Sequence, residues 1–135
     1  MIVVDVNVIA YLWLPGDMTG LAEKTLMRDP EWIAPVLWRS EFRNILAGYL
    51  RRGTLGIDAA RRCLEGAESH MAGREFVVSS HQVLPLLSAT PCSAYDCEYA
   101  ALALDRRVPL VTADAQLLAA FPRQAVSLRA FADGS

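Results

Sequence analysis

The sequence predicts an α/β fold in which helices cover both faces of a central, mainly parallel sheet of four to five short strands. The run Ile2-Val3-Val4 is β-branched and lacks polar alternation, which is typical of a parallel strand buried on both faces. Similar short runs alternate along the chain with longer segments of helical periodicity. A length of 135 residues and a hydrophobic content of 53% suit a single domain, residues 1–135, with a well-filled core.

Turn and capping residues divide the first half of the chain into strands and helices. We expect Asn7 to cap the first helix, Pro35 to open the third helix, and Gly53 to end it. The predicted order is a strand at Ile2–Val4, helices at Val8–Leu14 and Thr19–Arg28, a strand at Trp32–Ala34, and helices from Pro35 to about Arg52 and from Ile57 or Asp58 to about Ala72. The last two helices are expected to form a hairpin.

The second half of the chain alternates shorter elements. Pro85 interrupts one helical pattern, and Thr90-Pro91 separates it from the next. The predicted elements are strands at Glu75–Val78, Pro109–Thr112 and Ala125–Leu128, helices at His81–Ala89, Tyr95–Arg106 and Ala115–Ala120, and a frayed C-terminal tail.

Composition excludes several kinds of site and partner. A formal charge of −2 provides no general field for RNA, DNA or an anionic membrane, so nucleic-acid binding must rest on local arginines or on bound metal. Three cysteines without a CxxC spacing and two scattered histidines do not complete a zinc site. No apolar stretch reaches the roughly 18 residues needed to cross a bilayer, and the N-terminus lacks a basic leader. We therefore expect a cytoplasmic protein without a membrane partner.

Glu41 is the acid that helical periodicity singles out. It lies inside the apolar stripe of its helix, three residues after Trp38 and four before Ile45. A buried carboxylate without a partner is costly or takes up a proton. The alternative is that Glu41 lies at the edge of the stripe and pairs with Arg39 or Arg43, although residues two positions away point elsewhere on a helix.

Three aspartates stand at the junctions of predicted strands and helices. Asp5 and Asp114 each follow a predicted strand, so both belong at the carboxyl edge of the sheet, where open α/β sheets bind their ligands. Asp96 opens an almost wholly apolar helix. Asp96 and Asp114 also suit helix capping, Asp96 through the spacing Ser93-Ala94-Tyr95-Asp96.

These carboxylates are expected to meet if the first and fourth strands are neighbours. Asp5 and Asp114 then come within reach of one another, and the helix that starts at Tyr95 presents Asp96 beside them. Such carboxylates repel unless one is protonated or a cation neutralises them, and all-oxygen ligands suit Mg²⁺ or Mn²⁺. Asn7 and Thr112 are candidates to hold the acids or metal-bound waters in place.

Four short motifs follow one another along the chain: Val3–Val8, Ser40–Leu46, Tyr95–Ala103 and Leu110–Asp114. In this order they resemble the motifs of the PIN-domain nucleases, and within that family those of the small VapC-like toxins of prokaryotic toxin–antitoxin pairs. The resemblance covers nearly the whole chain, and its specificity lies in the order of the motifs. Ala115-Gln116 departs from the family pattern, in which a charged or polar residue often follows the last acid, so the number of metal ions stays open.

The resemblance implies a three-layer α/β/α PIN-like fold and a divalent-metal-dependent endoribonuclease with one or two Mg²⁺ or Mn²⁺ ions. Its catalytic, metal-binding acids would be Asp5, Glu41, Asp96 and Asp114. Asn7 and Thr112 would support them. Arg39 and Arg43 are candidates to guide the RNA backbone, with a solvated helix face as their alternative role. The implied partners are an RNA substrate, a cognate antitoxin protein and a second copy of the chain in a homodimer.

Other interpretations of the acids are weaker. A haloacid-dehalogenase-like phosphatase requires an aspartate two residues after Asp5, where this chain has Asn7, and a later lysine, whereas Lys24 is the only lysine. A receiver domain requires a lysine in the C-terminal half, which has none. The more serious alternative is a catalytically inactive PIN-like module that binds RNA or protein, and the presence of all four acids argues against it.

Overall fold

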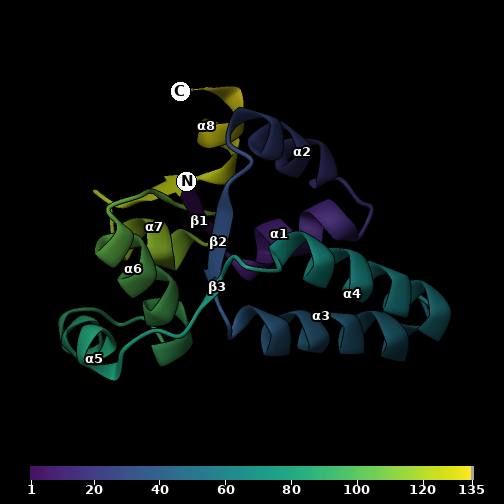
Figure 1. The fold of residues 1–135 in the computed structure, drawn as a ribbon, viewed down its shortest axis with the longest axis horizontal. Helices are drawn as coiled ribbons and strands as arrows, with labels where there is room; N and C mark the ends of the chain where they lie inside the picture. Colours follow the sequence, from purple (N-terminus) through teal and green to yellow (C-terminus); the bar gives the residue numbers. More distant parts are fainter. Residues whose placement is uncertain (135) are drawn as a thin grey trace.

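A five-stranded parallel sheet forms the centre of the protein, whose residues 1–134 are described by a computed structural model (Figure 1). The strands lie in the order β3-β2-β1-β4-β5. Their bounds are β1 (Ile2–Val4), β2 (Trp32–Pro35), β3 (Glu75–Phe76), β4 (Leu110–Thr112) and β5 (Ala125–Ser127). The prediction of an α/β fold is confirmed, with five strands that all run parallel.

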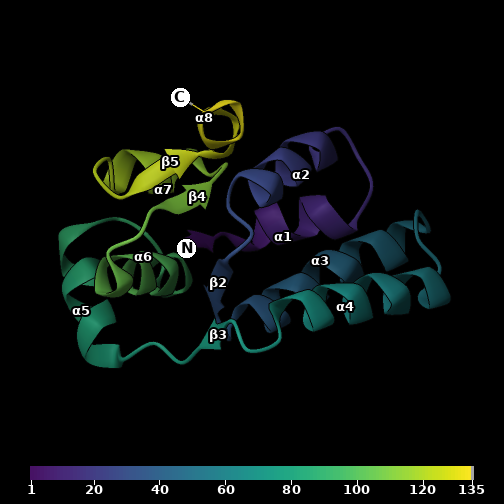
Figure 2. The same ribbon diagram turned by 45° about the horizontal axis from the view of Figure 1, so that its top comes forward.

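The helices alternate with the strands along the chain. They are α1 (Val6–Trp13), α2 (Thr19–Arg28), α3 (Trp38–Arg52), α4 (Ile57–Met71), α5 (Ser80–Ala89), α6 (Ala94–Arg106), α7 (Ala115–Ala120) and α8 (Leu128–Asp133). Helices α3 and α4 form the predicted hairpin, which extends away from the sheet in both views (Figures 1 and 2). Among residues 1–134 no helix is both long enough and apolar enough to cross a membrane.

The helices lie in two layers, one on each face of the sheet. Helix α6 packs against β1, β2 and β4, and α5 packs against α6. Helix α1 contacts β4 and packs against α2, α3 and α4, while α8 contacts β4 and β5. Between the layers the central strand is buried on both faces, as its apolar run predicts: Ile2, Val3 and Val4 are at most 1% exposed.

Several boundaries differ from the prediction, and three of them change the role of a named residue or segment. Asn7 is not the cap of the first helix, because α1 begins at Val6 and Asp5 occupies the N-cap position. Pro35 ends β2 rather than opening α3; the next residue, Val36, continues the pairing by donating its N–H to the carbonyl of Phe76 at 2.9 Å. The strand predicted at Glu75–Val78 ends at Phe76.

The predicted frayed tail is also wrong, since Leu128–Asp133 form the short helix α8. The hydroxyl of Ser127 accepts a hydrogen bond from the N–H of Ala130 at 3.1 Å and so caps the helix. Leu128 is 1% exposed, and the guanidinium of Arg28 on α2 lies 5.0 Å from the ring centre of Phe131. Apolar burial and this cation–π contact hold α8 against α2.

Candidate functional site

The strand order reverses at β1, between β1 and β4. From β1 the chain moves outward to β2 and β3 on one side, whereas β4 and β5 occupy the other side. Val4 pairs with Val111, and the N–H of Asp5 donates to the carbonyl of Val111 at 3.1 Å. The expected adjacency of the first and fourth strands is therefore present, and it brings Asp5 and Asp114 to one carboxyl edge, the usual position of ligands in open α/β sheets.

Asp5 is the buried member of the acidic group. Its side chain makes no capping bond to α1, although the residue stands at the N-cap. The hydroxyl of Thr112 instead donates to Oδ2 of Asp5 at 2.8 Å and accepts from the N–H of Asp114 at 3.0 Å. Burial raises the pKa of Asp5, Thr112 and the amide of Val6 lower it, and the charges of Asp96 and Asp114 raise it again.

Glu41 reaches the same edge from α3, and its orientation is set by a tyrosine. The buried hydroxyl of Tyr99 on α6 donates to Oε1 of Glu41 at 2.7 Å. Burial raises the pKa of Glu41, this hydrogen bond lowers it, and Asp5, Asp96 and Glu98 raise it further. Among the described residues Glu41 makes no ion pair, so the alternative in which it pairs with Arg39 or Arg43 is wrong.

The sequence offered a signal for Tyr99 that our prediction missed. Tyr99 follows Asp96 by three residues, so both lie on one face of α6. Burial, and the nearby charge of Glu41 with which it bonds, raise the pKa of Tyr99 well above its ordinary value, which keeps the hydroxyl protonated as a donor. Tyr99 is therefore a positioning residue for Glu41.

Asp96 and Asp114 combine a local structural role with a place in the acidic group. The N–H of Asp96 donates to the hydroxyl of Ser93 at 3.1 Å, as the capping spacing predicts. Oδ1 of Asp114 accepts from the N–H groups of Gln116 at 2.7 Å and Leu117 at 3.3 Å, which caps α7. The pKa of Asp96 is raised by burial and by the charge of Asp114, and lowered by Ser93.

The four acids thus lie close enough for their charges to repel one another, and no basic group of the described residues pairs with them. Within residues 1–134 neither Asp5, Glu41, Asp96 nor Asp114 makes an ion pair with a basic group. As the side chains stand, no three acidic, histidine or cysteine side chains of this described part are gathered closely enough to hold a metal ion. Carboxylate oxygens are nevertheless donors of the kind that a hard divalent cation requires.

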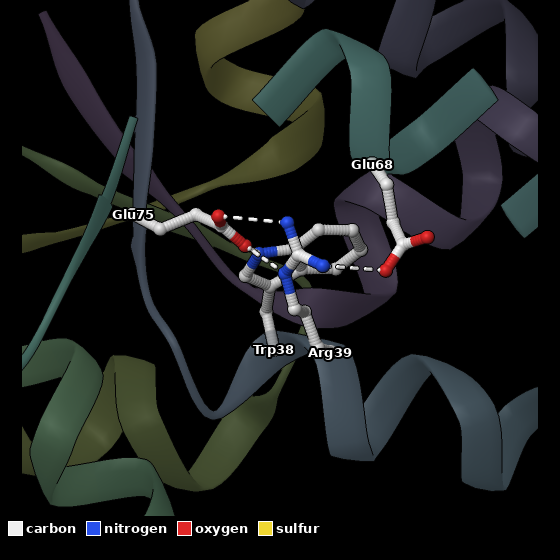
Figure 3. Close-up of polar contacts among 4 residues, drawn as sticks. All are labelled: Trp38, Arg39, Glu68 and Glu75. Atoms are coloured by element: carbon white, nitrogen blue, oxygen red, sulfur yellow. Dashed lines mark hydrogen bonds and ion pairs between the residues drawn. The ribbon is translucent and has the colours of Figure 1, made fainter. Parts of the chain in front are cut away.

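Arg39 lies in a separate polar cluster that joins α3, α4 and β3 (Figure 3). Its Nε and one terminal nitrogen donate to the two carboxylate oxygens of Glu75 at 2.5 and 3.0 Å, and its other terminal nitrogen donates to Glu68 at 2.6 Å. The indole N–H of Trp38 also donates to Glu75, at 2.6 Å. This network holds the base of the helical hairpin to the sheet edge, and it engages the guanidinium that was a candidate for RNA contact.

The remaining candidates are Thr112, Asn7 and Arg43, and they differ in burial and in their neighbours. Thr112 is fully buried and bonds both Asp5 and the N–H of Asp114. Asn7 is exposed and lines a hollow of about 440 Å³ that Glu41 also lines. Arg43 is exposed and borders an apolar hollow between α3 and α4. The structure thus brings Thr112 and Asn7, but not Arg43, to the acidic edge.

Comparison with known proteins supports the fold. The structure is similar to the crystal structure of PAE2754 from Pyrobaculum aerophilum, with a TM-score of 0.79 and 22% sequence identity over 98% of this chain and 94% of that chain. No protein-family model and no curated protein matches the sequence. At this identity the likeness establishes the fold alone: a parallel α/β architecture with the PIN-like strand order β3-β2-β1-β4-β5.

Proposed function

We propose that this chain is a divalent-metal-dependent endoribonuclease that hydrolyses RNA phosphodiester bonds. The observation that carries the proposal is the uncompensated group formed by Asp5, Glu41, Asp96 and Asp114 at the point where the strand order reverses. A chain selected for stability alone would neutralise or remove such mutual repulsion. The PIN-like fold and the four motifs support the same reading.

Mg²⁺ or Mn²⁺ held by these four acids would lower the pKa of an attacking water and stabilise charge on the phosphoryl oxygens. Thr112 fixes the carboxylate of Asp5 through a hydrogen bond of 2.8 Å. Tyr99 fixes Oε1 of Glu41 through a hydrogen bond of 2.7 Å. Asp96 and Asp114, which are only partly buried, would turn inward on cation binding. The protein groups therefore supply geometry and negative charge.

Cleavage of single-stranded RNA tests the proposal directly. Wild-type protein should cleave in Mg²⁺ or Mn²⁺ and stop in EDTA, and Asp5→Asn should abolish cleavage. Asp58→Asn is the matched control, because Asp58 lies on α4 with a side chain 80% exposed and, among residues 1–134, forms an ion pair only with Arg61. Cleavage that survives EDTA or Asp5→Asn would contradict the proposal.

The toxin assignment rests on the resemblance to VapC-like proteins. It implies that the protein acts in the cytoplasm, that expression of the wild type arrests growth, and that Asp5→Asn relieves the arrest. A cognate antitoxin would restore growth, and size-exclusion chromatography with light scattering would report the expected homodimer. Growth that continues while active protein accumulates would separate ribonuclease activity from a toxin role.

The second candidate is a catalytically inactive PIN-like module that binds RNA or protein. Its specific support is the side chain of Asp114, which is engaged in capping α7 rather than turned toward Asp5. A folded wild-type protein that binds RNA but leaves every RNA uncut in Mg²⁺ and in Mn²⁺ would favour this candidate.

A further inference from the structure

The hollow beside the acids has features that metal binding does not use. It has a volume of about 440 Å³, within the usual range for small-molecule sites, and lies where the start of α1, the first half of α3 and the start of α6 converge. Glu41 forms part of its wall, and Val6, Leu37 and Ile45 supply apolar surface. The hollow is therefore continuous with the proposed catalytic site.

Its rim carries an aromatic ring and two amides that the protein does not use. Tyr95 is 60% exposed, and within the described part of the chain its ring makes no aromatic or cation–π contact. Asn7 and Asn44 are exposed and line the same hollow, without a side-chain hydrogen bond to any residue between 1 and 134. An exposed aromatic ring beside free amides matches the way proteins bind unpaired RNA bases.

The charges of the hollow favour a neutral, flat ligand. Glu41 in its wall would repel an anionic group, whereas a nucleobase is uncharged and has two apolar faces. Asn44 follows Glu41 by three residues, so both lie on one face of α3, and Tyr95 directly precedes Asp96 on α6. Helices α3 and α6 thus each carry one of the four acids and one residue of the rim.

We propose that this hollow binds one unstacked base of a single-stranded RNA substrate, next to the phosphate that is cleaved at the four acids. The base stacks on Tyr95, and the amide of Asn44, with Asn7 opposite, hydrogen-bonds its edge. The proposal rests on the proposed ribonuclease function and adds to it a binding site for one base. A base paired in a duplex is already stacked and cannot enter, so the site selects unpaired RNA.

Binding of labelled RNA hexamers, measured by fluorescence anisotropy in Mg²⁺, tests the site separately from cleavage. The parent for this assay is Asp114→Asn, which suppresses cleavage under the proposed function while asparagine still caps α7. Tyr95→Ala in this parent should weaken binding of single-stranded hexamers by roughly 5- to 30-fold, in the lower part of the range for base stacking. Tyr95→Phe, which keeps the ring, should bind within about 2-fold of the parent.

The matched control is Leu104→Ala, since Leu104 lies on the same helix with 44% exposure but outside the hollow. It should leave hexamer binding unchanged. Asn44→Ala should reduce the differences in affinity among oligo-A, oligo-C and oligo-U hexamers, because the amide that reads the base edge is removed.

The result that overturns the proposal is single-strand binding by Tyr95→Ala that equals that of the parent, or an equal loss for duplex and single strand. Because Tyr95 is largely exposed, its removal leaves the core intact, and the Tm of the variant verifies this. If wild-type protein cuts no RNA, the ribonuclease proposal fails while the anisotropy data still decide the base site. If wild-type protein cuts RNA and Tyr95→Ala binds normally, only the base site fails.

Discussion

The substitution Tyr99→Phe isolates the hydrogen bond that orients Glu41. It removes one hydroxyl from a fully buried ring and leaves the ring packing in place. Hydrogen bonds to charged groups contribute about 1.5–3 kcal/mol, and because Glu41 is partly exposed, water replaces part of the loss, so we expect about 1–2 kcal/mol. With an unfolding entropy of about 2.1 cal/mol/K per residue, a chain of 135 residues should lose about 4–7 °C in Tm.

The same substitution should move the pH dependence of RNA cleavage. The Tyr99 hydrogen bond lowers the pKa of Glu41, so its loss raises that pKa further. If ionised Glu41 is required, the acidic limb of the kcat/KM profile shifts to higher pH. The control is Tyr49→Phe on α3, whose hydroxyl bonds no residue between 1 and 134 and whose Tm should change little. A lower Tm with an unmoved acidic limb would refute the positioning role of Tyr99.

Four further predictions follow from the contacts. Mg²⁺ at 100 times its Kd should stabilise the wild type by about 2.7 kcal/mol, or about 10 °C in Tm, and Asp5→Asn should remove this shift. Because the folded-state pKa of Asp5 is raised, its ionisation opposes folding at neutral pH. In urea titrations with EDTA present, the free energy of unfolding of the wild type should therefore rise relative to that of Asp5→Asn as the pH falls through this pKa. A fall in the relative stability of the wild type would contradict the assignment. Arg39→Ala should lower the free energy of unfolding in urea by about 1–3 kcal/mol through lost hydrogen bonds to Glu68 and Glu75, without changing kcat/KM on RNA. Reduced RNA affinity of this variant would instead indicate that Arg39 contacts the RNA. Leu128→Ala should cost about 2–5 kcal/mol, and a loss below about 1 kcal/mol would contradict the packing of α8.

Much of the fold could be predicted because local patterns and tertiary contacts agree. The apolar run Ile2–Val4 is buried as its composition indicates, and Ser93 and Asp114 cap helices where their spacing places them. Helix α8 was missed because six residues carry too little periodicity, and its stability comes from Leu128 and from contacts with α2. Its local signal was Ser127, a serine directly before a helix-compatible run.

The site was predictable in outline but not in its partners. Two aspartates that follow parallel strands meet at one edge once those strands are neighbours, so Asp5 and Asp114 follow from topology. The bond between Tyr99 and Glu41 joins residues 58 positions apart. The spacing from Asp96 indicates which face of α6 Tyr99 occupies, but it does not identify Glu41 as its partner. For the same reason the partners of Arg39 on α4 and β3 were not predictable, because they depend on how distant elements pack.

The central claim is that the four acids bind a divalent cation, and equilibrium binding of Mn²⁺ followed by electron paramagnetic resonance tests it most directly. The acids predict saturable Mn²⁺ binding by the wild type and by the control Asp58→Asn. Asp5→Asn, which removes the buried carboxylate, should weaken that binding by more than about 10-fold. Equal Mn²⁺ affinity in the wild type and in Asp5→Asn, or no binding by the wild type, would contradict the assignment of this edge of the sheet as a metal site.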